Sequence, residues 1–349
     1  MKPLKLGLIG AGVGADFVAR AVSVIKEENI VELVAVASSH PERAKAFAEK
    51  HGIPNWYSDY KEMLRKAGIE AVAICTPHYL HFPMAIDAIE EELHVLVDKP
   101  MAISIREADE MIRRSEKKGV KLGVILQSRF DPKFRKMKEL IDSGELGKII
   151  LGEAVVKWHR TQEYYDKSVW RGRWATEGGG ALINQAIHTI DLLIWMLGEP
   201  DYLWAQIDTV AHNIEVEDLA TAIIRFKNGA LGVIEGSTAT YPGFPTRLEI
   251  HGTEGAILIE GETVKFAEAK GKKLKIEEEK TGKLASWARP ELVPPENHAR
   301  LIKDFALAVR EDRKPYIDGY EGKRAVEVIL AIYASGKRNE LIRFPYKDY

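Results

Sequence analysis

The amino-acid sequence predicts an α/β protein of two domains, a doubly wound parallel sheet followed by a domain with a large, mostly antiparallel sheet. In the first 126 residues, short apolar runs alternate with helical patterns, which is the order that builds a parallel sheet. From residue 127 onward, strand-like segments follow one another, several separated by tight turns such as Lys227-Asn228-Gly229. We therefore expect domains at 1–126 and 127–349, each large enough to bury its own core.

The predicted parallel sheet has its ligand-binding edge where its strands end. Its strands are expected at 4–9, 31–37, 71–75, 94–97 and 121–126, and its helices at 12–28, 41–50, 80–91 and 105–118. In the second domain we expect strands at 149–158, 203–211, 219–226, 231–238, 247–252 and 256–260, and helices at 132–143, 186–197, 298–310 and 319–337. The charged stretch 268–283 is expected to be an edge hairpin or a solvated loop.

Composition and charge limit the partners that the sequence predicts. The net charge is −2 and basic residues do not cluster, which argues against nucleic acid and against an anionic membrane. No apolar run approaches the length of a membrane helix, and the N-terminus leads into a strand without a signal peptide. The only cysteine, Cys75, cannot form an internal disulfide, which fits a reducing compartment, so we expect a cytoplasmic protein.

A glycine-rich loop follows the first predicted strand and opens the first helix. In this loop, Gly10 permits a tight turn, and Gly12 lets a pyrophosphate approach the backbone. Ala15 allows close packing of the helix on the strand, and the helix N-terminus supplies N–H donors. The loop therefore predicts a dinucleotide site, to which we also assign Val13 and Gly14.

The end of the second strand usually shows which nicotinamide cofactor is bound. An acidic residue there would bind the ribose hydroxyls of NAD, but this sequence has Ser38, Ser39 and His40 instead. Ser38 and Arg43, assisted by His40, would suit a 2′-phosphate, so the cofactor is expected to be NAD(P) with a slight preference for accepting NADP. The alternative is that Pro41 and its neighbours are only an ordinary helix start.

The loops after the later strands are expected to surround the cofactor ring. Lys99 follows the fifth strand, where an ammonium group would polarise a substrate hydroxyl or carbonyl; a nearby oxidised nicotinamide would lower its pKa. The alternative for Lys99 is a surface lysine before proline. His78 and His81 have a spacing that suits a metal, but no further ligands accompany them, so no metal is predicted. Cofactor contacts are also expected from Thr76, Pro77, His81, Asp98, Lys99 and Gln127.

A second group of polar residues lies at the start of the long apolar helix predicted in the second domain. His188 comes four residues after Asn184, so both point to one side of a helix. A histidine suits transfer of the hydroxyl proton when a hydride leaves an alcohol carbon. The preceding Gly178-Gly179-Gly180 allows the backbone to approach a ligand closely. The alternative is a core histidine; Asp191 is expected on the helix surface, and Asn184→Asp is expected to be tolerated.

Aromatic and arginine residues are concentrated between positions 158 and 174. Aromatic faces stack on the C–H faces of a polyhydroxylated ring, and arginines donate to hydroxyl, carboxylate or phosphate oxygens. Part of this stretch would otherwise be core or a subunit contact. Substrate contacts are expected from Lys99, Arg129, Trp158, Tyr165, Trp170, Arg171, Asn184 and His188.

Together these motifs resemble the glucose-fructose oxidoreductase, inositol dehydrogenase and rhizopine-catabolism (Gfo/Idh/MocA) family over essentially the whole chain. The matching pieces are Gly10–Ala15, Thr76-Pro77 with His81, His94–Pro100, Gly178–Gly180 with Asn184 and His188, His251–Gly255, and Asp304-Phe305 with Glu321-Gly322. The resemblance implies a Rossmann domain, a second α+β domain whose open sheet forms a homodimer or homotetramer, and Lys99 and His188 as the catalytic pair. It implies an NAD(P)-dependent dehydrogenase acting on a sugar, sugar derivative or cyclitol.

Two departures from the family pattern concern charge. Asp98 replaces the usual Glu before Lys-Pro, and Asn184 replaces the usual Asp four residues before the histidine. Because an amide neither takes a proton nor raises the pKa of an imidazole, His188 is expected to work alone or with Lys99, and Asn184 is expected to have a positioning role only. A redox-assisted glycosidase and a non-catalytic nucleotide-binding regulator remain alternatives, and the intact Lys99 and His188 argue against the regulator.

Overall fold

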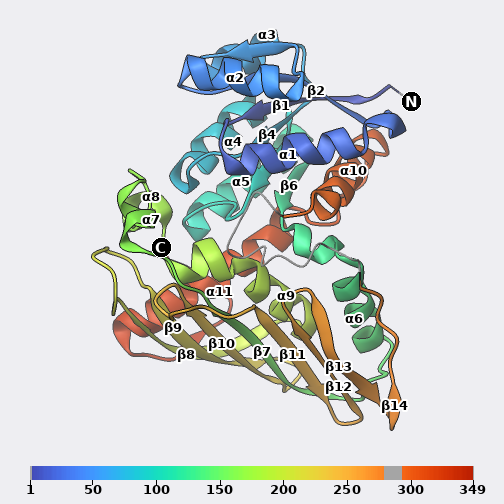
Figure 1. Ribbon diagram of the computed structural model, residues 1–349, viewed down its shortest axis with the longest axis vertical. Helices are drawn as coiled ribbons and strands as arrows, with labels where there is room; N and C mark the ends of the chain where they lie inside the picture. The colour runs from blue at the N-terminus through green and yellow to red at the C-terminus, as the bar shows by residue number, and fades with distance from the viewer. Residues whose placement is uncertain (1, 279–292, 349) are drawn as a thin grey trace. The chain divides into compact units, whose positions relative to one another are not determined.

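The computed structural model describes residues 2–278 and 293–348 and divides the chain into two compact units (Figure 1). The first unit contains the chain up to Gln127 together with Val293–Lys323, and the second contains Ser128–Leu292 and the chain from Arg324 onward. The first division therefore lies one residue from the boundary that the sequence predicts. Residues 279–283 of the charged stretch expected to form a hairpin or loop lie outside the described residues.

The assignment of all of 127–349 to one domain is wrong for Val293–Lys323. Helix α10 (Glu296–Arg310) packs against α1 (Val13–Val24), where the ring of His298 stacks on that of Phe17 at 5.1 Å. Phe305 of α10 fills the space beside Gly123, where an added Cβ would lie only 2.8 Å from its ring. This helix completes the core of the first unit.

The first unit contains a six-stranded parallel sheet of the order β3-β2-β1-β4-β5-β6. Its strands are β1 (Leu4–Ile9), β2 (Val31–Ala37), β3 (Asn55–Tyr57), β4 (Ala71–Ile74), β5 (His94–Asp98) and β6 (Leu122–Ile125). The intervening helices are α1, α2 (Pro41–His51), α3 (Tyr60–Lys66), α4 (His81–Glu90) and α5 (Ile105–Lys118). The order reverses between β1 and β4, which is where such sheets bind ligands. The sequence analysis did not predict β3 or α3.

The second unit contains a nine-stranded sheet of the order β14-β13-β12-β11-β7-β10-β9-β8-β15 (Figure 1). Only β7 and β10 pair in parallel among the registers of this sheet, so it is mostly antiparallel, as predicted. The strands are β7 (Ile149–Lys157), β8 (Pro200–Asp208), β9 (Leu219–Phe226), β10 (Leu231–Ser237), β11 (Arg247–Gly252), β12 (Gly255–Glu260), β13 (Thr263–Ala269), β14 (Lys272–Lys273) and β15 (Ile342–Arg343).

One face of this sheet is covered by α9 (Ile187–Leu197), which contacts β7, β10 and β11. A π-helical turn, η4 (Ala181–Ala186), runs directly into α9. The remaining helices are α6 (Pro132–Asp142), α7 (Gln162–Asp166), α8 (Trp174–Glu177) and α11 (Gly319–Arg338), of which α11 begins in the first unit. The expectation that no apolar run approaches the length of a membrane helix is wrong for Trp174–Leu197, which is long and apolar enough to cross a membrane. In the structure, 83% of its most apolar window is buried among other residues of the chain.

Candidate active site

The glycine-rich loop has the geometry of a phosphate cradle. Gly10 adopts φ +116° and an added Cβ would lie 2.2 Å from the carbonyl oxygen of Cys75, so only glycine fits there. At Gly12, in contrast, an added Cβ would have no heavy atom within 4 Å, which leaves open space above the loop. Ala15 is fully buried and lets α1 pack closely on the sheet. The N-terminus of α1 thus faces a space that a pyrophosphate would fill.

Two buried polar atoms at the carboxyl edge of the parallel sheet have no hydrogen-bond partner among the described residues. These atoms are Oγ1 of Thr76, which follows β4, and Oε1 of Gln127, which follows β6. Buried polar groups are nearly always hydrogen-bonded in proteins. Both atoms therefore suit a bound ligand with polar groups, such as the ribose or carboxamide of a nicotinamide cofactor.

The loops after β4 and β5 are held together by His81. Its Nδ1 lies 2.7 Å from the carbonyl oxygen of Pro100 and its Nε2 lies 2.9 Å from that of Thr76. Burial lowers the pKa of His81. The charge of Asp98 and the hydrogen bonds to the two carbonyl groups act in the opposite direction but are weaker. A neutral ring donates to only one of the carbonyls at a time. His81 thus connects the two loops at which Thr76 and Lys99 lie.

Asp98 ends β5 and lies beneath the glycine loop. Its Oδ1 accepts a hydrogen bond from the backbone N–H of Lys99 at 2.8 Å, and its Oδ2 would lie 2.8 Å from a Cβ added at Gly14. Burial raises the pKa of Asp98, an effect that the positive charge of Lys99 reduces. The shorter side chain, where the family pattern has Glu, therefore leaves room for the close approach of Gly14.

The residues expected to select the cofactor lie at the end of β2. Ser38 is half-buried, and its Oγ accepts a hydrogen bond from the backbone N–H of His40 at 3.3 Å. His40 and Arg43 are exposed at the start of α2. No acidic residue follows β2 before Pro41, as the sequence shows.

In the second unit, Asn184 and His188 are the only residues of 177–194 that are not buried. They lie one turn apart, Asn184 in η4 and His188 in α9. A segment that is otherwise buried from residue 177 to residue 194 thus leaves an amide and an imidazole partly accessible, one turn apart. This pattern differs from that of a core histidine and is typical of functional side chains.

Glu177 anchors the segment that precedes these two residues. Its carboxylate is 1% exposed, accepts a hydrogen bond from Nδ2 of Asn184 at 2.5 Å and another from the backbone N–H of Gly172 at 2.5 Å. Both are charge-assisted hydrogen bonds of the stronger kind. The side chain of Asn184 is therefore fixed by a buried acid that the sequence analysis did not identify.

A second buried acid, Glu217, supports the glycine run. Its carboxylate accepts hydrogen bonds from the backbone N–H groups of Gly180 and Leu182 and from the hydroxyl of Tyr333, at 2.7, 2.9 and 2.9 Å. Burial raises the pKa of Glu217 to about 7, although the three donors oppose this. A Cβ at Gly180 would lie 2.0 Å from the carbonyl oxygen of Glu217, so the chain passes this acid as closely as glycine allows.

Aromatic rings and arginines gather around Tyr164. The guanidinium of Arg171 lies 4.3 Å from the centre of its ring, and that of Arg160 lies 5.4 Å from it. Trp158 packs under Arg160 at 5.1 Å and Trp170 under Arg171 at 5.1 Å. Within the described residues, Nε1 of Trp158 and Nε of Arg171 are buried without a hydrogen-bond partner. The cluster thus offers unsatisfied donors, which suit an oxygen-rich ligand.

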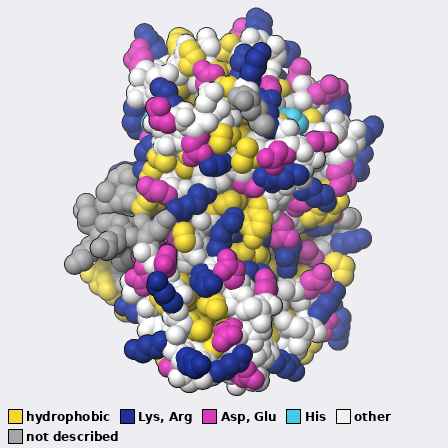
Figure 2. Space-filling model, turned by 90° about the vertical axis from the view of Figure 1, so that its right-hand side faces the viewer, with side chains coloured by type: hydrophobic (Ala, Val, Ile, Leu, Met, Phe, Trp, Pro, Cys, Tyr) yellow, Lys and Arg dark blue, Asp and Glu magenta, His cyan; other side chains and the backbone are white. Residues whose placement is uncertain are grey.

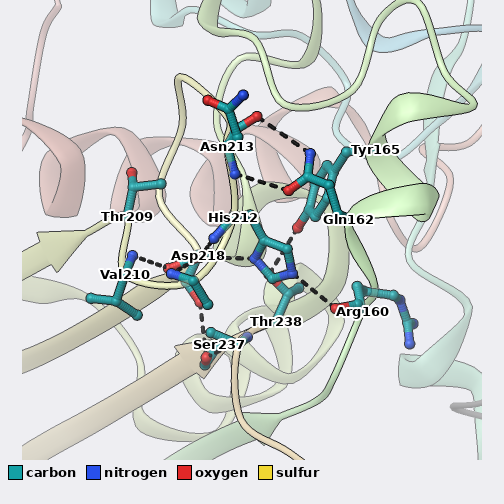
Figure 3. Close-up of polar contacts among 12 residues, drawn as sticks. Arg160, Gln162, Tyr165, Thr209, Val210, His212, Asn213, Asp218, Ser237 and Thr238 are labelled. Atoms are coloured by element: carbon teal, nitrogen blue, oxygen red, sulfur yellow. Dashed lines mark hydrogen bonds and ion pairs between the residues drawn. The ribbon is translucent and has the colours of Figure 1, made fainter.

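Asp218 holds the loop beside this cluster (Figure 3). Its carboxylate accepts hydrogen bonds from the backbone N–H groups of Val210, Ala211 and His212 at 2.8 to 3.0 Å, and contacts Nδ1 of His212 at 2.8 Å. The other ring nitrogen of His212 donates to the carbonyl oxygen of Arg160 at 2.8 Å. The backbone of Arg160 is thereby tied to a buried carboxylate.

Two residues expected to bind substrate have other contacts. Arg129 is 1% exposed, and its guanidinium forms an ion pair with Asp191, which is itself buried and not a surface acid. Tyr165 is 4% exposed and its hydroxyl hydrogen-bonds Thr238 at 2.8 Å. Arg129, Asp191 and Tyr165 therefore stabilise the second unit, and Tyr164 is the ring that accompanies the arginines. A tyrosine pair in sequence does not show which ring is buried.

The described residues contain no group of three His, Cys, Asp or Glu side chains that could hold a metal. On the face shown in Figure 2, Lys and Arg side chains are mixed with Asp and Glu side chains.

Comparisons with known proteins find relatives for both parts of the chain. Residues 4–126 match the family model of the oxidoreductase family with an NAD-binding Rossmann fold, and residues 134–258 match that of the GFO/IDH/MocA C-terminal domain. A myo-inositol 2-dehydrogenase of Thermotoga maritima is 25% identical over 345 residues, which cover 97% of this chain and 96% of the relative. A D-glucoside 3-dehydrogenase of Escherichia coli is 27% identical, with 97% and 98% covered.

A solved structure shows the same fold over the full length. The WlbA dehydrogenase of Bordetella pertussis, in complex with NADH and UDP-GlcNAcA, has a TM-score of 0.87 and 28% identity, with 99% of each chain covered. The two family models together match more than half of the chain, and the predicted resemblance is confirmed. The chain belongs to the Gfo/Idh/MocA family of NAD-binding oxidoreductases.

Proposed function

We propose that the protein is an NAD(P)-dependent dehydrogenase that moves a hydride between the nicotinamide and a secondary alcohol or ketone of a sugar, sugar derivative or cyclitol. The observation that carries this proposal is the exposure of Asn184 and His188 alone within the buried stretch 177–194. An imidazole at such an opening suits the proton transfer that must accompany removal of hydride from an alcohol. Relatives named for inositol and glucoside dehydrogenation support the substrate class.

In this proposal, separate residues bind the cofactor, transfer the proton and stabilise the charge on the substrate. The N–H groups at the start of α1, beyond Gly10 and Gly12, bind the pyrophosphate of the cofactor. The nicotinamide supplies or accepts the hydride when it is bound. His188 takes the hydroxyl proton during oxidation and returns it during reduction, while the ammonium of Lys99 stabilises negative charge on the substrate oxygen.

The two arginines beside Tyr164 favour a substrate with an acidic substituent. Arg160 and Arg171 bring two positive charges to one ring, and Nε of Arg171 is buried without a hydrogen-bond partner among the described residues. Guanidinium groups bind carboxylates and phosphates with paired hydrogen bonds. We therefore propose that sugar acids or sugar phosphates are oxidised in preference to the corresponding neutral sugars.

A substrate screen tests these proposals. Sugars, cyclitols and matched acidic and neutral pairs, such as glucose with glucuronate, are incubated with NAD or NADP while absorbance of the reduced cofactor is followed. Stoichiometric accumulation of reduced cofactor is expected with at least one substrate. Arg171→Ala should raise the KM for an acidic substrate more than for its neutral partner. If glycosides are hydrolysed without net reduction of cofactor, the redox-assisted glycosidase is the correct reading.

We also propose that a second copy of the chain covers the open face of the nine-stranded sheet. Trp204, Ile223, Val233, Leu258 and Phe266 lie in one register across it, with Glu153 and Glu249 between Val233 and Leu258. Trp204, Ile223 and Phe266 are 42%, 56% and 47% exposed. Large exposed apolar side chains in a row are typical of an interface. Light scattering should give a dimer or tetramer mass, and Ile223→Arg should lower it; a monomer at all concentrations would contradict the proposal.

A further inference from the structure

Glu177 forms a hydrogen bond with Asn184, the residue that replaces the aspartate of the family pattern. In this chain an amide occupies position 184, and its Nδ2 donates to Oε1 of Glu177 at 2.5 Å. The second oxygen of Glu177 accepts from the backbone N–H of Gly172 at 2.5 Å. Position 184 thus lacks the carboxylate of the family pattern, but the carboxylate of Glu177, seven residues earlier in the chain, lies in contact with it.

This contact determines which side of the Asn184 amide faces the opening. An ionised carboxylate can only accept hydrogen bonds, so it must face the NH₂ side of the amide. The carbonyl oxygen Oδ1 then lies on the opposite side of the amide group. Because Glu177 is buried and Asn184 is half-buried, Oδ1 lies on the side of the amide that is turned away from the buried acid.

The same carboxylate also connects the opening to the arginine cluster. Gly172, which donates to Glu177, directly follows Arg171, and its φ of +74° and its close contact with Ile214 restrict the position to glycine. The carbonyl oxygen of Gly172 accepts from the backbone N–H of Glu215 at 2.8 Å, which holds the segment from its other side. Glu177 therefore sets both the Asn184 amide and the backbone next to Arg171.

We propose that Glu177 is a positioning residue for the hydride-transfer reaction. It turns Oδ1 of Asn184 toward the substrate, where it accepts a hydrogen bond from a hydroxyl next to the reacting one, so that the reacting hydroxyl directs its single proton to His188. The chain thus keeps the acceptor that the usual aspartate would supply, without its negative charge beside the imidazole. This inference rests on the proposed dehydrogenase function.

The first test is Glu177→Gln, which changes one acceptor oxygen into a donor. The new amide would keep its oxygen on the N–H of Gly172 and present its NH₂ to Asn184. Asn184 must then rotate and offer NH₂, not oxygen, to the substrate. We expect kcat to fall by about 10²-fold, as for other misplacements near a reacting centre, with little change in the dissociation constant of the cofactor. Glu215→Gln is the matched control, because this exposed acid also accepts from a backbone N–H, that of Trp174.

The second test exchanges the two groups. Asn184→Asp alone places two carboxylates 2.5 Å apart, so it should also lower kcat, contrary to the tolerance expected from the sequence. The double variant E177Q/N184D satisfies every donor again, because the new amide donates to the new carboxylate. We expect the double variant to regain most of kcat and the thermal stability that each single variant loses. Its pH optimum should lie higher than that of the unmodified protein, since a carboxylate beside His188 favours the protonated imidazole.

Each outcome separates the two proposals. If the unmodified protein oxidises no member of the substrate screen, the proposed function fails, and this inference fails with it. If the protein is active and Glu177→Gln lowers only thermal stability, Glu177 is merely structural and this inference alone is wrong. Failure of E177Q/N184D to recover kcat above either folded single variant would also overturn it.

Discussion

The guanidinium of Arg129 binds both carboxylate oxygens of Asp191, with Nε to Oδ2 at 2.8 Å and Nη2 to Oδ1 at 2.6 Å. Both side chains are 1% exposed, so the pair is closed off from water. Asp191 lies in α9, three residues after His188, and Arg129 lies in η3 (Gln127–Phe130), so the ion pair joins these two helices. The half-buried imidazole of His188 therefore lies on a helix that is held by a buried ion pair.

Removal of one partner of this ion pair should destabilise the second unit strongly. Asp191→Asn leaves a buried guanidinium without its counter-charge, which typically costs about 3–5 kcal/mol. We expect the free energy of unfolding in urea to fall by that amount. Glu62→Gln, in the exposed pair with Lys66, is the control and should change it little. A comparable loss in the two variants would show that burial of the Arg129 pair is unimportant.

Gly12→Leu should abolish cofactor binding and leave the fold intact. An added side chain at Gly12 has no protein atom to meet and would occupy the space assigned to the pyrophosphate. Titration of the cofactor, followed by nicotinamide fluorescence, and circular dichroism measure the two effects. Gly10→Ala should behave differently and destabilise the first unit, because its Cβ would lie 2.2 Å from the Cys75 carbonyl oxygen. Unchanged affinity in Gly12→Leu would refute the assignment of the loop.

The end of β2 should admit NADP as well as NAD. No acidic residue stands between β2 and Pro41, where the ribose hydroxyls of NAD would be bound; Ser38 follows β2, and Arg43 is exposed in the first turn of α2, next to Glu42. We expect Arg43→Ala to lower kcat/KM for NADP more than for NAD. Lys45→Ala, at an exposed position on the same helix, is the control. A hundredfold preference for NAD that Arg43→Ala leaves unaltered would contradict the phosphate role.

His188→Ala and Lys99→Ala should each lower kcat by about 10²–10⁴. The expected reason is loss of the proton acceptor in the first variant and of the positive charge near the substrate oxygen in the second. Cofactor affinity should stay nearly unchanged in both. Lys117→Ala, at an exposed position on α5, serves as the control for removal of a lysine. Near-normal turnover of His188→Ala on a verified substrate would show that another group carries the proton.

Glu217 should make stability fall as the pH rises from about 4.5 to about 7. Its pKa in the folded protein is raised from 4.5 to about 7 because burial penalises the ionised form. Folding therefore favours the protonated carboxyl, and this advantage is complete below pH 4.5 and lost above pH 7. The difference amounts to roughly 3 kcal/mol at about 1.4 kcal/mol per pKa unit. Glu217→Gln should flatten this part of the profile, measured by urea unfolding at several pH values; a parallel profile would refute the raised pKa.

The sequence predicted the parallel sheet and most of the antiparallel one, because alternation and turn residues are local signals. It also predicted the glycine loop, whose residue requirements at Gly10 and Ala15 follow from backbone geometry alone. The short strand β3 was missed because Asn55 and Trp56 are exposed and carry no apolar pattern. The burial of Glu177 was not predicted, because the residues around it have no repeating apolar pattern.

The contacts that define the second half-site were harder to predict because they join distant segments. Charged residues such as Arg129 and Asp191 are expected on the surface when only the sequence is known, yet both are buried and form an ion pair with each other. Tyr164 and Tyr165 are adjacent, and only the fold shows that Tyr165 is the buried ring. Glu177 directly precedes the Gly178–Gly180 run, but neither its burial nor its contact with Gly172 could be inferred from spacing.

The return of Val293–Lys323 to the first unit has a practical consequence for dissecting the protein. A fragment ended at residue 126 or 127 lacks α10, and therefore exposes the surface around Gly123 that Phe305 covers. Such a fragment would be prone to aggregate in spite of containing every strand of the parallel sheet. The nucleotide-binding part is best made as one polypeptide in which residues 2–127 are joined by a flexible linker to residues 293–323.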